Sequence, residues 1–219
     1  MKKAFLLASL MTTSAMATEF NYTNIDIGYL NGKADLPREY ATLFALDDEL
    51  DTEGFFVNAR FEFTENFFGY VRYENGEIRT ETLGGVNFDA DLWRLEAGFG
   101  GALPLADTLD VYYGIGYKYT DLDFGNLGDQ NLGNVDLHVG LRWAPFAWIE
   151  LNPHLGYSLG VDNDDVLGAV DVATAGINLF VTAFDYVQPF GGITYELDSS
   201  SDNIVKDQVL YSAGLRFSF

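Results

Sequence analysis

The two histidines have the clearest capacity for chemistry in this sequence. His138 and His154 are the only histidines, and a hairpin folded around Pro145 would place them opposite each other on one face. Two imidazoles with Asp136 or Glu150 as the third ligand would make a minimal metal site. The sequence favours the simpler interpretation, in which the two imidazoles are hydrogen-bonded in a polar interior and hold no metal.

Carboxylates are the second chemical feature, and they are concentrated in two segments. The first set lies within 31–53 and consists of Asp35, Glu39, Asp47, Asp48, Glu49, Asp51 and Glu53; the second is Asp162, Asp164 and Asp165. Carboxylate oxygens suit Ca²⁺, but neither segment has the complete ligand pattern of an EF-hand loop. We therefore expect a solvated, repulsive surface, with a Ca²⁺ site as the alternative.

The composition of the 219 residues excludes several classes of protein. The absence of Cys excludes a disulfide framework, a thiolate zinc site and a Cys nucleophile. A formal charge of -21 excludes a phosphate-binding surface of the kind that holds nucleic acid. The hydrophobic fraction of 48% is too high for a disordered acidic chain, and 16% aromatic residues with 23 Gly favour strands.

The first 17 residues have the features of a secretory signal peptide. Lys2 and Lys3 form a basic start, 4–11 is a short apolar run, and 15–17 reads AMA, a small-residue cleavage site. We therefore expect a mature domain over 18–219. Because no later segment offers 18 consecutive apolar residues, no transmembrane helix is expected.

Alternation of apolar and polar residues predicts ten strands. Near the end of the chain, for example, Tyr211 and Ala213 alternate with Ser212 and Gly214, so opposite faces differ in polarity. The ten segments are 21–30, 54–64, 67–75, 91–100, 108–119, 134–143, 148–160, 172–183, 187–197 and 208–219. Eight strands are the alternative if 21–30 or 172–183 does not pair.

The connections alternate between short and long. The short ones are 64–66, 101–107, 144–146 and 185–186; the long, acidic ones are 31–53, 76–90, 120–133, 161–171 and 198–207. This asymmetry predicts an all-β fold, a closed antiparallel transmembrane β-barrel with short periplasmic turns and long extracellular loops. A soluble barrel of this size would have to bury its whole aromatic face, which would overfill the interior.

Aromatic residues on the apolar face form two expected membrane-interface girdles. Near the long loops these are Tyr29, Tyr73, Trp93, Tyr117, Tyr157 and Tyr195; near the short turns they are Phe63, Phe67, Phe99, Trp143, Phe217 and Phe219. Within 31–53, Tyr40, Leu43 and Phe44 follow Pro37 at helical spacing. We expect a short helix there that caps the barrel mouth; contact with the outer leaflet or with a partner is the alternative.

The polar face carries a charge network that we expect to fill the lumen. Its members are Arg60, Glu62, Arg72, Glu74, Arg94, Glu96, Lys118, Asp136, Arg142, Glu150, Glu196 and Arg216. The hairpin around Pro145 would place Arg142 opposite Glu150, and every inward Arg has a carboxylate within reach. Eleven inward glycines would leave some room beside the Arg chains. A plugged lumen is the prediction, and a polar pathway for ions or small solutes is the alternative.

The ending of the chain gives the clearest resemblance to a known family. Residues 211–219 read YSAGLRFSF, and Tyr211, Leu215, Phe217 and Phe219 resemble the signal that the barrel-assembly machinery reads. With the signal peptide and the even strand number, the chain resembles the small outer-membrane β-barrel proteins of Gram-negative bacteria. The resemblance implies the cell outer membrane and contact with its lipid and lipopolysaccharide. A Ca²⁺ ion on the acidic loops, if present, could be shared with lipopolysaccharide phosphates.

The resemblance leaves the activity open, because such barrels include adhesins, structural proteins, narrow pores and hydrolases. Barrel deacylases use a lipid-facing His, Ser and acid, and omptin-type proteases use Asp and His near the rim. His138 and His154 point inward from the middle of strands and match neither arrangement. We expect a non-enzymatic protein without a cofactor, in a structural or surface-interaction role. A narrow porin-like channel is the first alternative and a hydrolase the second.

Overall fold

The structure is a computed structural model that describes residues 20–35, 49–81, 87–123, 125, 129–163, 171–198 and 207–219. Within them, ten antiparallel strands form one closed barrel. The strands are β1 (Asn24–Asp35), β2 (Glu49–Thr64), β3 (Phe67–Glu81), β4 (Asn87–Ala106), β5 (Leu109–Asp123), β6 (Asp129–Phe146), β7 (Ile149–Asn163), β8 (Val172–Val181), β9 (Val187–Asp198) and β10 (Asp207–Ser218). Both segments whose pairing the sequence left open, now β1 and β8, pair on each side, so the barrel has ten strands and not eight.

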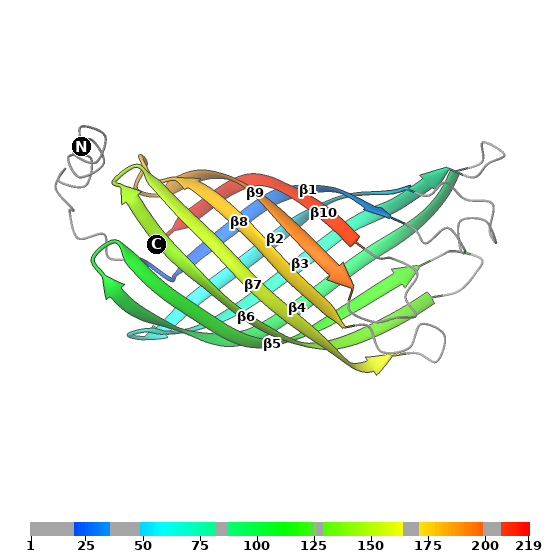
Figure 1. Cartoon of the computed structure of the whole chain (residues 1–219), viewed down its shortest axis with the longest axis horizontal. Coiled ribbons are helices and arrows are strands. Elements are labelled where there is room, and N and C mark those ends of the chain that lie inside the picture. Colours follow the sequence, from blue (N-terminus) through cyan, green and yellow to red (C-terminus); the bar gives the residue numbers. More distant parts are fainter. Residues whose placement is uncertain are drawn as a thin grey trace, which may run out of the picture.

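Every strand pairs with its neighbours in the sequence, and β1 pairs with β10 to close the ring. The four short turns and the C-terminus lie at one end of the barrel, on the left in Figure 1. The other end joins the strands through 36–48, 82–86, 124–128, 164–171 and 199–206. The predicted asymmetry of the connections is therefore confirmed.

Some of the predicted features lie outside the described residues. These are the signal peptide, the helix with Pro37, Tyr40, Leu43 and Phe44, and the side chains of Asp35, Glu39, Asp47, Asp48, Asp162, Asp164 and Asp165. In the part of the chain that the structure describes, no helix is long and apolar enough to cross a membrane.

Most strands are longer than the alternation predicts. β2 already begins at Glu49, and β4 extends through most of the predicted 101–107 link to Ala106, with a register irregularity between Pro104 and Ala106. Pro has no N–H to donate to a neighbouring strand, which explains an irregularity at this position. The strands continue into the polar ends because backbone pairing there does not need an apolar face.

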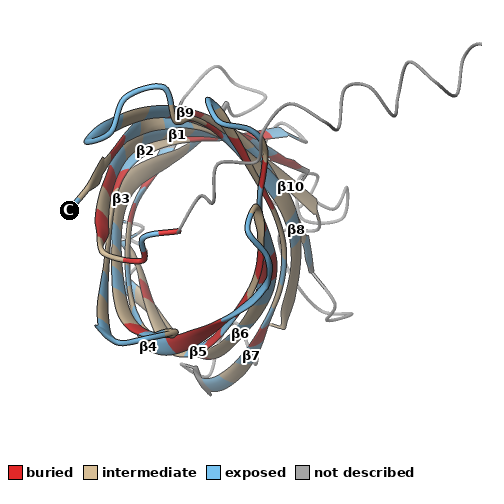
Figure 2. Ribbon diagram, turned by 90° about the vertical axis from the view of Figure 1, so that its left-hand side faces the viewer, coloured by how far each residue is buried: buried red, intermediate tan, exposed pale blue. Residues whose placement is uncertain are grey.

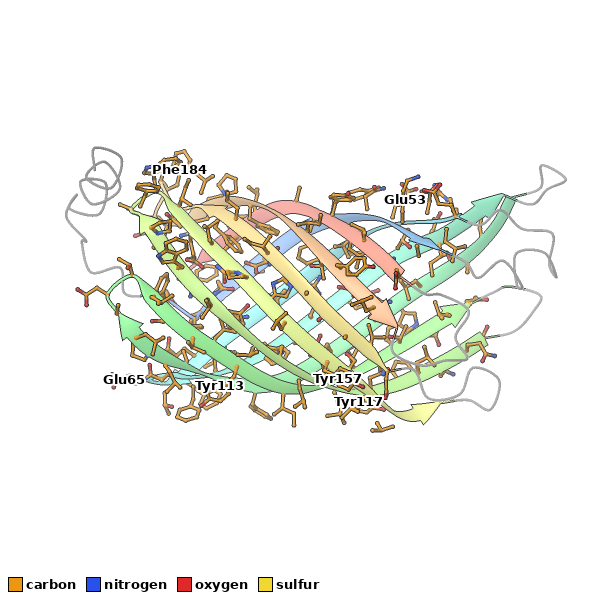
Figure 3. All side chains as sticks on the ribbon, viewed as in Figure 1. Glu53, Glu65, Tyr113, Tyr117, Tyr157 and Phe184 are labelled. Atoms are coloured by element: carbon orange, nitrogen blue, oxygen red, sulfur yellow. The ribbon has the colours of Figure 1, made fainter. Side chains whose placement is uncertain are left out.

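The wall of the barrel is apolar outside and charged inside. Phe61, Phe99 and Ile115 expose 63%, 68% and 53% of their surface, whereas Arg142 and Arg216 expose only 4%. Figure 3 shows the side chains that project from the outer wall, with Tyr113 and Phe184 toward the short-turn end. The predicted assignment of the two faces is confirmed.

The predicted register of the hairpin around Pro145 is wrong. Gly140, not His138, is the partner of His154, and His138 pairs with Gly156 instead. The turn lies at 147–148, and the register shifts between Trp143 and the end of β6. This shift lies beside Pro145, which cannot donate to the ladder. Because the offset is two residues, the predicted inward residues still point inward.

Candidate functional site in the barrel lumen

Two buried ion pairs lie in the lumen near the short-turn end, one between β6 and β7 and the other between β10 and β1. Arg142 donates two hydrogen bonds of 2.8 Å to the carboxylate of Glu150. Arg216 donates two hydrogen bonds, of 2.7 and 3.0 Å, to the carboxylate of Asp26. The Nη1 atom of Arg216 also lies 3.7 Å from Glu150, and the Asn152 amide donates to Glu150 at 2.5 Å. Bidentate arginine–carboxylate pairs are strong and geometrically specific, so these residues form one connected, fixed cluster.

The chain before β1 turns inward and covers this cluster. Figure 2, which looks into the short-turn end, shows this stretch inside the ring of strands. The backbone carbonyl of Asn21 accepts a hydrogen bond of 2.8 Å from Arg142, and the guanidinium of Arg142 lies 4.7 Å from the Phe20 ring centre and 4.8 Å from that of Tyr22. Residues 20–23, which we call the N-terminal plug, were not predicted from the sequence.

The N-terminal plug is held by aromatic stacking and by the C-terminus. The Tyr22 ring stacks on Phe68 with centroids 5.1 Å apart, and its hydroxyl donates to Asp110 at 3.1 Å. Burial raises the pKa of the Tyr22 hydroxyl, so the group stays protonated as a donor. The backbone N–H of Phe219 donates to the carbonyl of Thr23 at 3.2 Å, which ties the two ends of the chain together.

Arg60 departs from the expectation that every inward arginine meets a carboxylate. Its guanidinium lies 4.7 Å from the Phe68 ring centre, 5.5 Å from that of Tyr112 and 5.8 Å from that of Tyr22. Among the described residues its Nε atom has no hydrogen-bond partner. The cation is therefore stabilised by the ring faces beneath the plug and adds to the closure of this end.

A second layer of charges lies deeper in the barrel, around a cavity of about 250 Å³. Glu74 forms ion pairs with Arg72 at 2.6 Å and with Arg94 at 3.4 Å. The ammonium nitrogen of Lys118 lies 3.8 Å from a carboxylate oxygen of Asp136. The predicted members that line this cavity are Arg60, Arg72, Glu74, Arg94, Glu96, Lys118, Asp136, Glu196 and Arg216. The structure thus brings most of the predicted charge network together around one space.

Three predicted members do not line the cavity. Arg142 and Glu150 belong to the cluster beneath the plug. Glu62 accepts a hydrogen bond of 3.3 Å from the backbone N–H of Asn66, in the turn between β2 and β3. In the described part of the chain Glu62 forms no ion pair, so its place is in the turn and not in the network.

Several inward glycines face aromatic or imidazole rings, which occupy much of the room that the sequence was expected to leave beside the Arg chains. A Cβ atom at Gly98 would lie 2.5 Å from the Tyr70 hydroxyl, and one at Gly114 would lie 2.5 Å from Nε2 of His138. Rings on one strand lie over glycines on the next, and so they take the space that the missing side chains leave. This packing narrows the bore further than the sequence predicts.

The two histidines do not form the predicted pair. Nδ1 of His138 lies 3.5 Å from Oδ2 of Asp136, whereas Nδ1 of His154 lies 3.3 Å from the backbone carbonyl of Asn152. A different group, Glu96 with Asp136 and His138, brings one ligand atom from each residue within 4.8 Å of the others. The sequence singled out two of these residues, but it did not place Glu96 with them.

Comparison with known proteins places this architecture in a family. A family model described as the outer membrane protein beta-barrel domain matches residues 4–160. The chain belongs to this family. No curated protein matches the chain.

Several solved structures share the fold of this outer-membrane barrel. An outer membrane channel from Pseudomonas putida F1 has a TM-score of 0.56 and 8% identity, covering 95% of this chain and 100% of that one. The translocator domain of the autotransporter NalP from Neisseria meningitidis has a TM-score of 0.53 and 12% identity, with 99% and 96% covered. The transport unit of the autotransporter AIDA-I from Escherichia coli has a TM-score of 0.51 and 12% identity, with 99% and 97% covered. Identities this low show a shared fold and nothing more.

The outer-membrane barrel lies in the outer membrane of a Gram-negative bacterium, in contact with its lipid. The short-turn end, with the plug and Phe219, is periplasmic, and the other end faces the cell exterior. A transmembrane strand needs about 9–11 residues, whereas β2 has 16 and β4 has 20. The longer strands therefore project beyond the membrane on the outer side and form an extracellular rim.

The extracellular rim is strongly acidic. Its described carboxylates include Glu49, Asp51, Glu53, Glu77, Asp89, Asp91, Asp121, Asp123, Asp129, Asp171 and Asp207. Lys33 pairs with Glu49, and Arg79 pairs with Glu53 and Glu77, all of them exposed. Below the rim, the hydroxyls of Tyr29 and Tyr195 donate to Glu53 and Asp207 at 2.9 Å, linking the aromatic girdle to the acids.

Proposed function

We propose that this outer-membrane barrel is a non-enzymatic protein that acts through its extracellular rim and keeps its lumen closed to solutes. The observation that carries the proposal is the closure of the periplasmic end. There the N-terminal plug packs on the ion pair of Arg142 and Glu150, whose side chains are only 5% and 4% exposed. A conducting pore needs a continuous polar path, and a fixed cluster of buried ion pairs beneath the plug opposes one.

The arrangement around His138 also supports a role without catalysis. Ser158 donates its hydroxyl hydrogen bond to Asp136, and Asp136 in turn faces the imidazole. A serine hydrolase needs the imidazole between the serine and the acid, because the imidazole must take the hydroxyl proton. Lys118 donates to the same hydroxyl at 2.9 Å and lies 3.8 Å from Asp136, so it acts as a paired cation and not as a base.

The acidic rim supports a role in surface interaction. Among the described residues, its carboxylates outnumber the rim cations Lys33 and Arg79, and they lie on strands that project past the membrane. Such a surface attracts cationic partners, and Ca²⁺ shared with lipopolysaccharide phosphates would anchor it in the outer leaflet.

The last strand supports recognition by the barrel-assembly machinery. Tyr211, Leu215 and Phe219 expose 53%, 41% and 69% of their surface on the outer wall, and Phe217 lies on the same face. β10 also forms the closing seam with β1. The proposal therefore assigns the assembly signal to these four residues, within a mature barrel of 18–219.

Planar-bilayer recording tests the closed lumen. We expect no conductance steps from the unmodified barrel, and steps from the Phe20→Ala/Tyr22→Ala variant, which loses the rings against Arg142 and Phe68. A matched control is Phe184→Ala/Tyr186→Ala, two exposed aromatics in a periplasmic turn, which should stay silent. Regular steps from the unmodified barrel would favour the narrow channel and overturn the closed lumen.

Binding of a fluorescent cationic peptide to intact cells tests the rim. We expect the Asp89→Asn/Asp91→Asn/Asp123→Asn variant to bind less peptide at low salt, because it removes three negative charges from the exposed rim. The control changes the same number of exposed acids at the periplasmic end, namely Glu65→Gln, Asp107→Asn and Asp185→Asn. Equal losses from both variants would contradict a role for the rim.

A further inference from the structure

We propose that the lumen holds a divalent transition-metal site formed by Glu96, Asp136 and His138. One ligand atom from each residue lies within 4.8 Å of the other two, and Asp136 and His138 line the same cavity as Glu96. The histidine pair suggested by the sequence is replaced by two carboxylates and one imidazole. The inference concerns the lumen alone and does not depend on the role of the rim.

The site forms across β5, which has Lys118 opposite Glu96 but glycines opposite the two ligands on β6. Glu96 is on β4, and Asp136 and His138 are on β6, so β5 separates them. At the positions paired with Asp136 and His138, β5 has Gly116 and Gly114. Because neither glycine projects into the lumen, the Glu96 carboxylate can reach the two residues of β6 directly.

The spacing of the donor atoms suits a shared ion. Two ligands about 2.1 Å from a tetrahedral ion lie about 3.4 Å apart, and Nδ1 of His138 lies 3.5 Å from Oδ2 of Asp136. That distance is long for a hydrogen bond, so the two atoms gain little from direct contact. A carboxylate oxygen of Glu96 lies within 4.8 Å of a ligand atom of each of these residues and would move toward the ion on binding. One imidazole with two carboxylates suits Zn²⁺, Mn²⁺, Fe²⁺ and Co²⁺.

The Tyr70 hydroxyl lies at the same place and supports the site. It is buried, and its interaction with Glu96 includes a side-chain hydrogen bond. The hydroxyl lies over Gly98 and Gly116, and the Tyr70 ring stands edge-on to His138 with centroids 5.3 Å apart. A hydrogen bond from this hydroxyl would orient the Glu96 carboxylate as a metal ligand.

The two carboxylates of the site favour a cation, and Lys118 competes for Asp136 while Arg72, the β3 partner of Glu96, competes for Glu96. Glu96 and Asp136 contribute two negative charges, and Lys118 lies 3.8 Å from Asp136. Lys118 also donates a hydrogen bond of 2.9 Å to Ser158, so the ammonium group would keep a hydrogen-bond partner when an ion displaces it from Asp136. Removing the lysine charge should therefore strengthen metal binding, the opposite of the effect expected for a merely structural ion pair.

Calorimetric titration of the chelator-treated, tag-free protein in detergent with Co²⁺ tests the site. We expect one equivalent of Co²⁺ to bind, with binding weakened at least about tenfold in His138→Ala and strengthened in Lys118→Gln. His154→Ala is the matched control, since His154 lines the same cavity but bonds to Asn152. Heat-modified migration in SDS gels confirms that each variant is folded.

Visible absorption of Co²⁺ gives a second readout that does not depend on affinity alone. An imidazole ligand changes the position and strength of the Co²⁺ bands, and this change should be present in His154→Ala and absent from His138→Ala. The site is refuted if His138→Ala binds as the unmodified barrel does, if His154→Ala loses as much binding, or if Lys118→Gln weakens binding.

Discussion

The Glu150→Gln substitution is the most direct test of the closure of the periplasmic end. Glu150 receives both hydrogen bonds of the Arg142 fork at 2.8 Å, lies 3.7 Å from Arg216 and accepts from Asn152. Gln has the same shape but no charge. The change therefore leaves Arg142 buried and without its counter-ion, while the packing volume stays the same.

The expected cost follows from this burial. Breaking a buried pair by removing one partner costs about 3–5 kcal/mol. In this variant Arg142 still donates a hydrogen bond to the carbonyl of Asn21 and still contacts the ring faces of Phe20 and Tyr22. We therefore expect a loss of unfolding free energy at the lower end of this range, about 3 kcal/mol. The control is Glu77→Gln, which breaks an exposed pair with Arg79 and should cost less than about 1 kcal/mol.

Guanidinium unfolding in detergent micelles, followed by the fluorescence of the three Trp residues, measures both free energies. A double variant, Arg142→Met/Glu150→Leu, adds a further test. It removes both buried charges together, so it should recover much of the lost stability. If Glu150→Gln lowered the free energy of unfolding by no more than Glu77→Gln, the buried cluster would not stabilise the closed periplasmic end, and the proposed closure by the N-terminal plug would be refuted.

Three further predictions concern the wall and the rim. Ile115→Arg, on the lipid-facing wall, should lower the free energy of unfolding by about 2–4 kcal/mol in lipid vesicles, because hydrocarbon solvates the charge poorly. Gly116→Ala should cost about 1–3 kcal/mol in the same assay, because the new methyl group would meet the Tyr70 hydroxyl. At the rim, Asp123 is paired with Asp129, and its charge raises the pKa of Asp129. The resulting destabilisation is present at neutral pH and disappears as the pH falls toward 3.8, so Asp129→Asn should stabilise the barrel at pH 7 and flatten the pH dependence of unfolding.

The strands and the two faces of the wall could be predicted because lipid imposes a simple rule on the sequence. Every outward residue in the membrane must be apolar, so alternation is strict along segments such as 91–100 and 208–219, and both are strands. The rule weakens where the wall leaves the membrane. In 120–123 the outward face carries Asp121 and Asp123 in place of apolar residues, and therefore the predicted strand ended before the real one.

The register of β6 and β7 depends on local geometry that alternation does not report. An offset of two residues leaves every side chain on its predicted face, so the pattern is equally satisfied by either pairing. The choice is made by the turn at 147–148 and by the irregularity beside Pro145. The plug escaped prediction because the first predicted strand, 21–30, included three of its four residues, whereas β1 begins only at Asn24. Residues 20–23 are too few to show a period of their own.

The group of Glu96, Asp136 and His138 could not be predicted from the pattern along single strands, because its members lie on strands that are not adjacent. Alternation places each residue in the lumen, and register places it beside a neighbour on the next strand, but these side chains meet across a strand that lies between them. Such a contact forms only where the middle strand has glycines at consecutive inward positions, as β5 does at 114 and 116. The same absence of side chains admits the Tyr70 ring over Gly116. Inward glycines on a middle strand are therefore the sequence signal for a site inside a barrel, because they decide which distant side chains can reach one another.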